Sequence, residues 1–319
     1  DYSRVGRYKI NRRLNLDTPN TKEFRSFQMK DLVAIISELI RLNNTQEAPD
    51  DIDSLSNRRV KQVGELVAAS FRSGIIHMRK NIRDRMSSAD LETVSPSSLI
   101  NARPIVAKVR EFFTSSKLSQ GMDEVNPVSE LSHLRHLSSM GPGGLVRERA
   151  GYDVRDAHPT HYGRICPVET PEGANVGLVL NIAQYAKINE YGFIETPYLV
   201  VKDGKVTNEI VYLDADAEMK EVIADASAEL NEDGSFKQER VSARRSLAPS
   251  LVDREEITLM DSAHNQILGI TAGLVPFIEK NRVDRSLTGS NMQRQAVPLL
   301  VAEAPIVGTG MEYRAAKDS

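Results

Sequence analysis

The spacing of apolar residues changes twice along this 319-residue chain, and each change limits what the chain can form. Up to about residue 113 the apolar positions recur at helical spacing. This pattern predicts an amphipathic helix over 28–43, a longer one over 60–86, and shorter helical stretches from 97 onward. Gly74 lies inside the longer helix and is expected to bend or divide it. The first third of the chain is therefore predicted to be helical.

Regular periodicity is lost between Thr114 and Pro171. Glycine, proline, serine, histidine and arginine accumulate there around a Gly-Pro-Gly-Gly turn at 141–144. A long irregular segment inside a folded chain is uncommon unless it serves binding. The glycine turn lacks the Lys-Ser/Thr pair of a phosphate-binding loop, so a tight loop is the favoured interpretation. This segment is where the sequence predicts a functional site.

Alternating apolar patterns begin after this segment and indicate β structure. They predict strands over 176–188, 193–201 and 206–213. Asp203-Gly204 is a hairpin signal between the last two, and Asp233-Gly234 predicts a turn between two further strands. The section 189–275 is expected to form a separate lobe. The predicted fold class is α+β: a multidomain fragment with a helical N-terminal part, a loop-rich mixed region and a β-rich appended lobe.

Composition narrows the class of protein. Hydrophobic residues make up 40% of the chain and charged residues 27%, which is typical of a globular protein. Cys166 is the only cysteine, so no disulfide forms within the chain and a reducing compartment, the cytoplasm, is expected. No apolar run reaches the length of a membrane span and the first residues lack the apolar core of a signal peptide, so no membrane association is expected.

The net charge of −3 does not by itself indicate nucleic acid. Five arginines are nevertheless interleaved with glycines, as in a folded surface that presents guanidinium groups to phosphates. They are Arg135, Arg147, Arg149, Arg155 and Arg164. A solvated surface without a ligand is the alternative interpretation of this series.

Two groups of residues contain possible metal ligands. Asp214, Asp216 and Glu218 alternate in YLDADAEMK and superficially resemble a magnesium-binding array. The apolar residues that follow them instead favour a charged helix start on a solvated lobe.

The second group is His158, His161 and Cys166. Imidazole and thiolate are good zinc ligands, but three residues without paired spacing do not make a structural zinc site. They are interpreted as residues that organise a loop. The sequence predicts no metal site and shows no nucleophile–base pair for catalysis.

Several strings resemble the β subunit of bacterial RNA polymerase. The segment 118–178 is similar to the rifamycin-pocket and fork region of that family, and it reads LSQGMDEVNPVSELSHLRHLSSMGPGGLVRERAGYDVRDAHPTHYGRICPVETPEGANVGL. Four further strings are similar to other β-subunit blocks and follow the family's order: VGRYKINRRL from Val5, DDIDSLSNRRVKQVGEL from Asp50, NEYGFIETPY from Asn189 and NMQRQAVPLL from Asn291. The resemblance covers essentially the whole chain.

The resemblance implies four parts: a helical protrusion-like part over 1–114, the fork and rifamycin pocket over 115–188, a β-rich external lobe over 189–275, and a segment over 276–319 that returns to the fork beside the active centre. It also implies a DNA-directed RNA polymerase, a nucleotidyltransferase whose Mg²⁺ is held by the β′ subunit. This chain would then carry no catalytic residue, bind no cofactor and be inactive alone. The implied partners are the β′, α, ω and sigma subunits, the DNA template, the RNA–DNA hybrid and rifamycin antibiotics.

The resemblance also assigns residues. Contacts to nucleic acid or nucleotide are implied for Arg147, Arg149, Arg164, Glu172 and Arg285. Rifamycin-binding positions are implied at Gln120, Asp123, His133, His136, Ser138, Met140, Arg147, Pro171, Asn175 and Val179. Polar groups around an apolar floor are typical of small-molecule pockets.

The chain also departs from the family. Gly121 stands where phenylalanine is usual, Leu134 where lysine is usual, and His136 where arginine is usual. Further departures are Lys117, Arg282 and Asp284. The first group implies weakened rifamycin binding, because an aromatic group and a charged donor are missing from the pocket.

An alternative from another class is a free-standing, non-catalytic module that binds nucleic acid or serves assembly and shares these strings. An enzyme of unrelated chemistry based on Asp214, Asp216 and Glu218 is a third hypothesis. The ends of the chain favour the polymerase fragment, since Asp1 and Ser319 both fall inside motifs, whereas a free-standing module is expected to have capped, polar termini.

Overall fold

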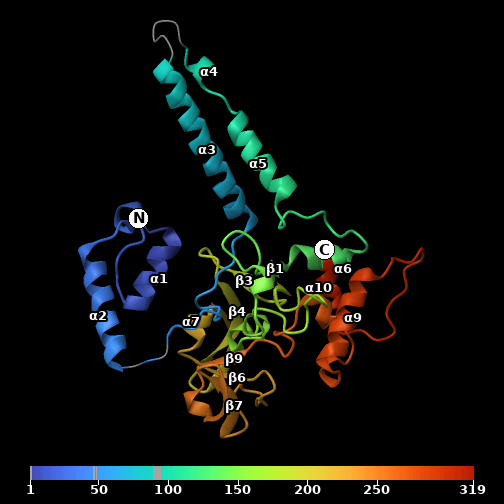
Figure 1. Cartoon of the computed structure of the whole chain (residues 1–319). Coiled ribbons are helices and arrows are strands. Elements are labelled where there is room, and N and C mark those ends of the chain that lie inside the picture. The colour runs from blue at the N-terminus through green and yellow to red at the C-terminus, as the bar shows by residue number, and fades with distance from the viewer. Residues whose placement is uncertain (1, 46, 48, 89–94) are drawn as a thin grey trace.

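The computed structural model describes residues 2–45, 47, 49–88 and 95–319, and Figure 1 shows their arrangement. The N-terminal part contains α1 (Arg4–Leu14), the short 3₁₀ helix η1 (Lys22–Arg25) and α2 (Met29–Thr45). Ser3 caps α1 by accepting a hydrogen bond from the backbone N–H of Gly6, and Asn15 ends the helix in the left-handed conformation. The predicted helix over 28–43 is confirmed by α2.

A long helical hairpin projects from the rest of the chain (Figure 1). It consists of α3 (Val63–Ser88), the one-turn α4 (Pro96–Leu99) and α5 (Arg103–Ser115). The expected division at Gly74 is wrong, because α3 runs without a break from Val63 to Ser88. Gly74 is needed for another reason: a Cβ at this position would lie 2.7 Å from the Cα of Ile105, so only glycine lets the two backbones approach this closely.

The segment after the hairpin contains only short elements, as its lack of periodicity predicts. They are α6 (Pro127–Leu134), β1 (His136–Ser138), the 3₁₀ helices η2 (Arg147–Arg149), η3 (Asp153–Arg155) and η4 (Pro159–His161), and β2 (Val179–Asn181). Strands β1 and β2 pair antiparallel, with Leu137 opposite Leu180. The apolar residues behind this pair join a cluster around Ile165 and Ile182.

A seven-stranded sheet follows. Its strands are β3 (Lys187–Ile188), β4 (Ile194–Lys202), β5 (Lys205–Leu213), β6 (Val222–Ala224), β7 (Arg240–Arg245), β8 (Ala248–Asp253) and β9 (Leu259–Asp261). The order is β3-β4-β9-β6-β7-β8, with β5 paired to β4. The hairpin predicted at Asp203-Gly204 is confirmed, and both residues have the positive φ that such a two-residue turn requires.

Two strand predictions need correction. The strand expected over 176–188 is two short strands, β2 and β3, separated by an irregular stretch in which Ala183 and Gln184 are buried. The strands expected on either side of Asp233-Gly234 are reduced to isolated bridges, Lys205 with Ser235 and Leu230 with Phe236.

The remaining elements lie between and after the strands. They are α7 (Ala215–Glu218), η5 (Arg254–Glu256), α8 (Ile270–Gly273), η6 (Ile278–Lys280), α9 (Val283–Gln295) and α10 (Glu312–Asp318). Helices α6, α9 and α10 gather beside the loop-rich segment (Figure 1), although α9 and α10 follow α6 by more than a hundred residues. The α+β class is confirmed, while the four-part division of the chain stays a prediction.

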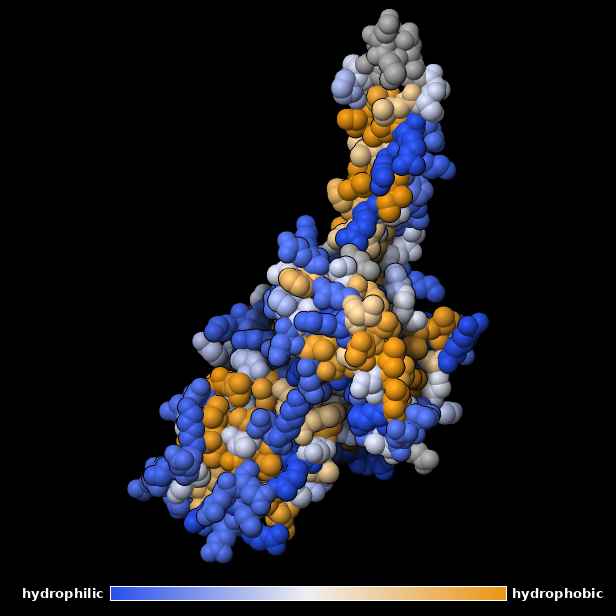
Figure 2. All heavy atoms as spheres, turned by 90° about the vertical axis from the view of Figure 1, so that its left-hand side faces the viewer, coloured by the Kyte–Doolittle hydropathy of each residue, from blue (hydrophilic) through white to orange (hydrophobic). Residues whose placement is uncertain are grey.

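Exposed apolar side chains lie on the helices and also on the segment between α9 and α10. Figure 2 shows them along the projecting hairpin, where they alternate with charged side chains. Those on α3 and α5 include Phe71, Ile75, Ile76, Met86, Val106 and Phe113. None of the helices in the described part of the chain is both long and apolar enough to span a membrane.

Candidate functional site

The irregular segment brings three of the expected pocket residues into one hydrogen-bonded unit. His133, on α6, accepts a hydrogen bond at Nδ1 from the backbone N–H of Asp123 at 3.0 Å. Its Nε2 lies 3.0 Å from Oε1 of Gln120. Because Nδ1 accepts, the proton of the neutral ring is on Nε2 and is donated to Gln120. His133 therefore orients the loop that carries Gln120 and Asp123.

His136 follows at the start of β1, with its ring centroid 5.6 Å from that of His133. Burial lowers the pKa of His136 to about 4, and the positive charge of Arg294 acts in the same direction. The imidazole is therefore neutral at pH 7. This position offers one N–H donor and no positive charge.

A second group of expected pocket residues lies on and beside the β1–β2 pair. Ser138 is opposite Val179 in the register. The hydroxyl of Thr170 donates to the carbonyl of Val179 at 3.0 Å and accepts from the N–H of Gly177 at 2.9 Å. This closes the loop that holds Pro171 and Asn175. Among the described residues, no hydrogen bond or ion pair joins this group to the Gln120–His133 unit.

The arginine series separates into inward and outward members. Arg135 donates to the carbonyl of Ala183 at 2.8 Å, and Arg155 donates to the carbonyls of Ala174 and Val176 at 2.9 and 2.8 Å. These two arginines hold backbone in place. The sequence signal that could have identified Arg155 is Gly177, whose Cα approaches the backbone of Arg155 so closely that a Cβ would lie 2.3 Å from its carbonyl oxygen.

Arg147 and Arg149 are the outward members. Both lie on the 3₁₀ helix η2 and are exposed. Within the described part of the chain, neither forms an ion pair or a side-chain hydrogen bond. Two guanidinium groups on one exposed turn can bind phosphate oxygens with their parallel N–H donors.

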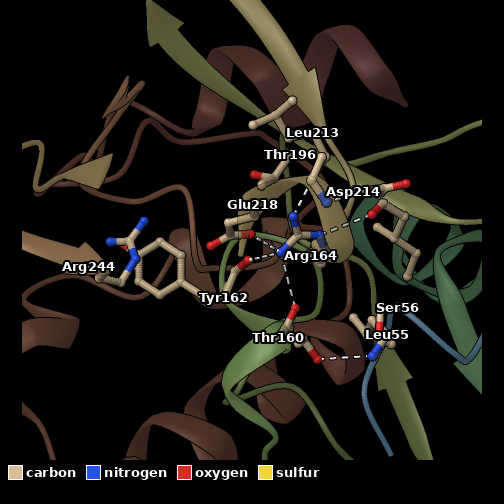
Figure 3. Close-up of polar contacts among 12 residues, drawn as sticks. Leu55, Ser56, Thr160, Tyr162, Arg164, Thr196, Leu213, Asp214, Glu218 and Arg244 are labelled. Carbon is tan, nitrogen blue, oxygen red and sulfur yellow. Dashed lines mark hydrogen bonds and ion pairs between the residues drawn. The ribbon is translucent and has the colours of Figure 1, made fainter. Parts of the chain in front are cut away.

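The phosphate contact predicted for Arg164 is wrong. Its side chain is fully buried and forms an ion pair with Glu218 at 2.5 Å. The guanidinium also donates to the carbonyls of Ile194 and Leu213, at 3.0 and 2.9 Å, and to that of Thr160 (Figure 3). All of these partners are protein groups, so Arg164 joins the loop-rich segment to the sheet.

A second, partly buried ion pair lies near this cluster. Arg244 forms two hydrogen bonds to Asp261, at 2.7 and 2.8 Å, and its guanidinium carbon lies 3.7 Å from the ring centroid of Tyr162 (Figure 3 shows Arg244 and Tyr162). Burial raises the pKa of Tyr162, and the charge of Asp261 raises it further. Sequence reasoning missed this cluster, because nothing in the local pattern pairs residues so far apart along the chain.

The carboxylates of YLDADAEMK are also placed differently from the prediction. Asp214 caps α7, as the helix-start interpretation requires, and accepts from the N–H of Ala217 at 2.9 Å. However, Asp214 and Glu218 are buried and not solvated. Arg12 of α1 binds both Asp214 and Asp216, the latter through Nε at 2.6 Å. All three carboxylates are thus paired with arginines, Asp214 and Asp216 with Arg12 and Glu218 with Arg164.

The possible zinc ligands do not converge. His158 pairs with Asp51 at 2.7 Å, and Cys166 is buried with a pKa raised by burial to about 12. Across residues 2–45, 47, 49–88 and 95–319, no group of three or more His, Cys, Asp or Glu side chains could hold a metal ion.

Helix α9 carries the remaining expected contact residue and is held against the loop. Arg285 is exposed on its first turns. The hydroxyl of Thr288 donates to Glu172 at 2.9 Å, and Asn291 donates to the carbonyl of Thr170 at 3.4 Å. Glu172 is therefore held against the helix that carries Arg285.

Comparison with known families identifies the class to which this arrangement belongs. Family models match three stretches of the chain: RNA polymerase Rpb2, domain 2, over residues 1–61; RNA polymerase Rpb2, domain 3, over 120–188; and the RNA polymerase beta subunit external 1 domain over 198–263. All three describe parts of one class, the Rpb2-type subunits of RNA polymerases.

Individual relatives are similar over the whole chain. The DNA-directed RNA polymerase subunit beta of Erythrobacter litoralis (strain HTCC2594) is 54% identical over all 319 residues, which are 23% of that relative. That of Rhizobium meliloti (strain 1021) is also 54% identical over the same length and 23% of its own. The chain belongs to the family of bacterial DNA-directed RNA polymerase β subunits and spans about a quarter of the length of these relatives.

Proposed function

We propose that this chain is the part of a DNA-directed RNA polymerase β subunit that contacts the template, the RNA–DNA hybrid and the route by which nucleotides enter, and that it lines a rifamycin pocket. It works in transcription as part of a nucleotidyltransferase assembled with β′, α, ω and sigma subunits. The catalytic Mg²⁺ belongs to β′ in this proposal. The residues of this chain bind and orient, and they do not carry out the chemical step.

The observation that carries the nucleic-acid contact is the exposed pair Arg147 and Arg149. The other arginines of the loop-rich segment are tied to carbonyls or to a buried carboxylate, whereas these two have no partner among the described residues. Their location on a short turn held between glycines and the β1–β2 pair presents both guanidinium groups to solvent. Such groups position a nucleic-acid backbone without reading its sequence.

Arg147→Ala and Arg149→Ala test this proposal in the assembled polymerase. Each lost phosphate contact is expected to lower the slope of log affinity against log salt by about 1. Arg240→Ala is the matched control, because Arg240 is an exposed arginine on β7 of the lobe whose ion pair with Asp253 is exposed on both sides. Unchanged slopes in both loop variants contradict the proposed contact.

The Gln120–His133–Asp123 unit and the β1–β2 group support the rifamycin pocket. Both present polar groups next to partly buried apolar residues, as small-molecule sites do. The family's usual arginine at position 136 would give this pocket a charged donor. The neutral His136 does not supply that charge. The free-standing module stays an alternative without a specific observation in its favour.

A further inference from the structure

Asn126 joins two helices that are far apart in the sequence. Its Oδ1 accepts a hydrogen bond from the N–H of Ser129 at 2.8 Å and so caps the N-terminus of α6. Its Nδ2 donates to three carbonyls at the C-terminal end of α9. They are those of Gln293, Arg294 and Ala296, at 3.0, 3.3 and 2.7 Å.

This arrangement satisfies both helix ends with one side chain. The last carbonyls of a helix have no partner within the helix, and the C-terminal end carries partial negative charge, so an amide N–H₂ is a well-matched donor there. The orientation of the amide is also fixed by its neighbours. The opposite orientation would place Oδ1 against three carbonyl oxygens and N–H₂ against the N–H of Ser129.

Helix α9 depends on such contacts because it buries little apolar surface. Its buried side chains are Ser286 and Ser290, and Leu287 packs only partly against the cluster of Cys166 and Val168. Among the described residues, its other side-chain hydrogen bonds to the loop-rich segment are the single ones of Thr288 and Asn291. The three hydrogen bonds of Asn126 are therefore the largest fixed attachment of its C-terminal end.

We infer that Asn126 is a positioning residue that fixes α9 relative to α6, and that it thereby links the placement of Arg285 to the pocket residues Asp123 and His133. The positioning of α9 follows from the contacts, whereas the link to nucleotide binding rests on the proposed function. Asp123 and His133 lie on either side of Asn126 along the chain, and the carbonyl of Asp123 accepts from the hydroxyl of Ser129 at 3.0 Å. Asn126 thus lies within the pocket segment and also contacts the C-terminal end of α9.

Asn126→Asp separates the two halves of this role. Aspartate is as good an N-cap as asparagine, so α6 remains capped. It cannot donate to the three carbonyls, and its charge faces the negative end of α9. In the assembled polymerase, amide hydrogen exchange over residues 293–297 is expected to become faster by about tenfold or more. The KM for nucleotides is expected to rise about three- to tenfold while kcat changes less than twofold, because Arg285 is displaced and not removed.

Two controls make each outcome decisive. Ser129→Ala weakens the cap of α6 without touching α9, and Asn231→Asp makes the same chemical change on the exposed lobe. Unchanged exchange at 293–297 in Asn126→Asp, or the same acceleration in Ser129→Ala, overturns the positioning role. Faster exchange with an unchanged nucleotide KM overturns the link to Arg285. A wild-type assembly that cannot transcribe contradicts the proposed function alone, because exchange is measured without substrate.

Discussion

Arg7 and Asp31 form a bidentate ion pair in which both side chains are completely shielded from solvent. Nη1 and Nη2 of Arg7 lie 2.6 and 2.8 Å from the two carboxylate oxygens of Asp31. The second oxygen also accepts from the N–H of Gln28, the residue just before α2. The pair fastens α1 to α2, which have few other contacts with each other.

Asp31→Asn is expected to destabilise this pair of helices, since it leaves the guanidinium of Arg7 buried without a counter-charge. Breaking a buried ion pair costs about 3–5 kcal/mol, and the lower end is expected here because only a thin layer of protein surrounds the pair. Urea unfolding of the chain measures the loss. Glu23→Gln, an exposed change on η1, is the control and should alter the free energy of unfolding by less than about 0.5 kcal/mol.

Arg164→Ala is expected to unfold the junction between the loop-rich segment and the sheet, because Glu218 is left as an unpaired buried charge. The cost is about 3–5 kcal/mol. Arg164→Met combined with Glu218→Leu removes both charges and should recover a large part of this loss. Thermal unfolding of the single and double variants makes the comparison. A single variant as stable as the wild type would show that the charge is not effectively buried.

Asp214→Asn tests the corrected interpretation of the acidic cluster. Asparagine still caps α7, so the variant isolates the interaction with Arg12, whose loss is expected to cost about 1.5–3 kcal/mol. Burial alone would raise the pKa of Asp214, but hydrogen bonds from Arg12 and the N–H of Ala217 lower it below its ordinary value of 3.8. The carboxylate therefore stabilises the fold above about pH 4, and this contribution is lost as the pH falls through the lowered pKa.

The measurement for this prediction is urea unfolding of wild type and Asp214→Asn at several pH values, with Asp216→Asn as a more exposed control. The difference between wild type and Asp214→Asn should shrink below pH 4. Magnesium affinity should be the same in all three proteins. A loss of magnesium binding in Asp214→Asn would restore the metal-site hypothesis.

His136→Arg with Gly121→Phe is expected to strengthen rifampicin binding by roughly ten- to a hundredfold, the value of one hydrogen bond to a charged group. No atom lies within 4 Å of where a Cβ at Gly121 would be, so phenylalanine fits without a clash there. The imidazole of His136, with a pKa of about 4, gives no charge-assisted contact between pH 6 and 8.

Inhibition curves on the assembled wild-type and double-variant polymerases check this prediction. Leu134→Lys is the control, because Leu134 is an exposed departure from the family's pattern that is not among the implied rifamycin-binding positions. Wild-type inhibition already at nanomolar rifampicin would contradict this account of the pocket.

The elements that could be predicted from the sequence are those whose pattern is local. The helical spacing over 28–43 and the Asp203-Gly204 turn depend on neighbouring residues, and both are confirmed. The parallel pairing of β6 with β9 depends on residues more than thirty positions apart and has no local signature. For the same reason the sequence shows that Arg164 is charged but not that Glu218 and four backbone carbonyls surround it.

The site shows the same limit. Resemblance names Gln120, Asp123 and His133, and the structure shows how His133 connects the other two. The resemblance does not distinguish an outward Arg147 from an inward Arg155. That difference depends on which carbonyls lie within reach after folding. The sequence shows which side chains are charged, but not which groups they contact in the folded chain.

The close approach at Gly74 makes the projecting hairpin behave mechanically as one rod. Helix α3 has 26 residues and is therefore about 39 Å long. A rotation of about 5° at its base moves the far end by roughly 3 Å. Because the backbones of α3 and α5 touch at Gly74 and Ile105, both helices must turn together. A small rotation at the base of the hairpin is therefore carried by both helices together, and the displacement grows with distance along α3.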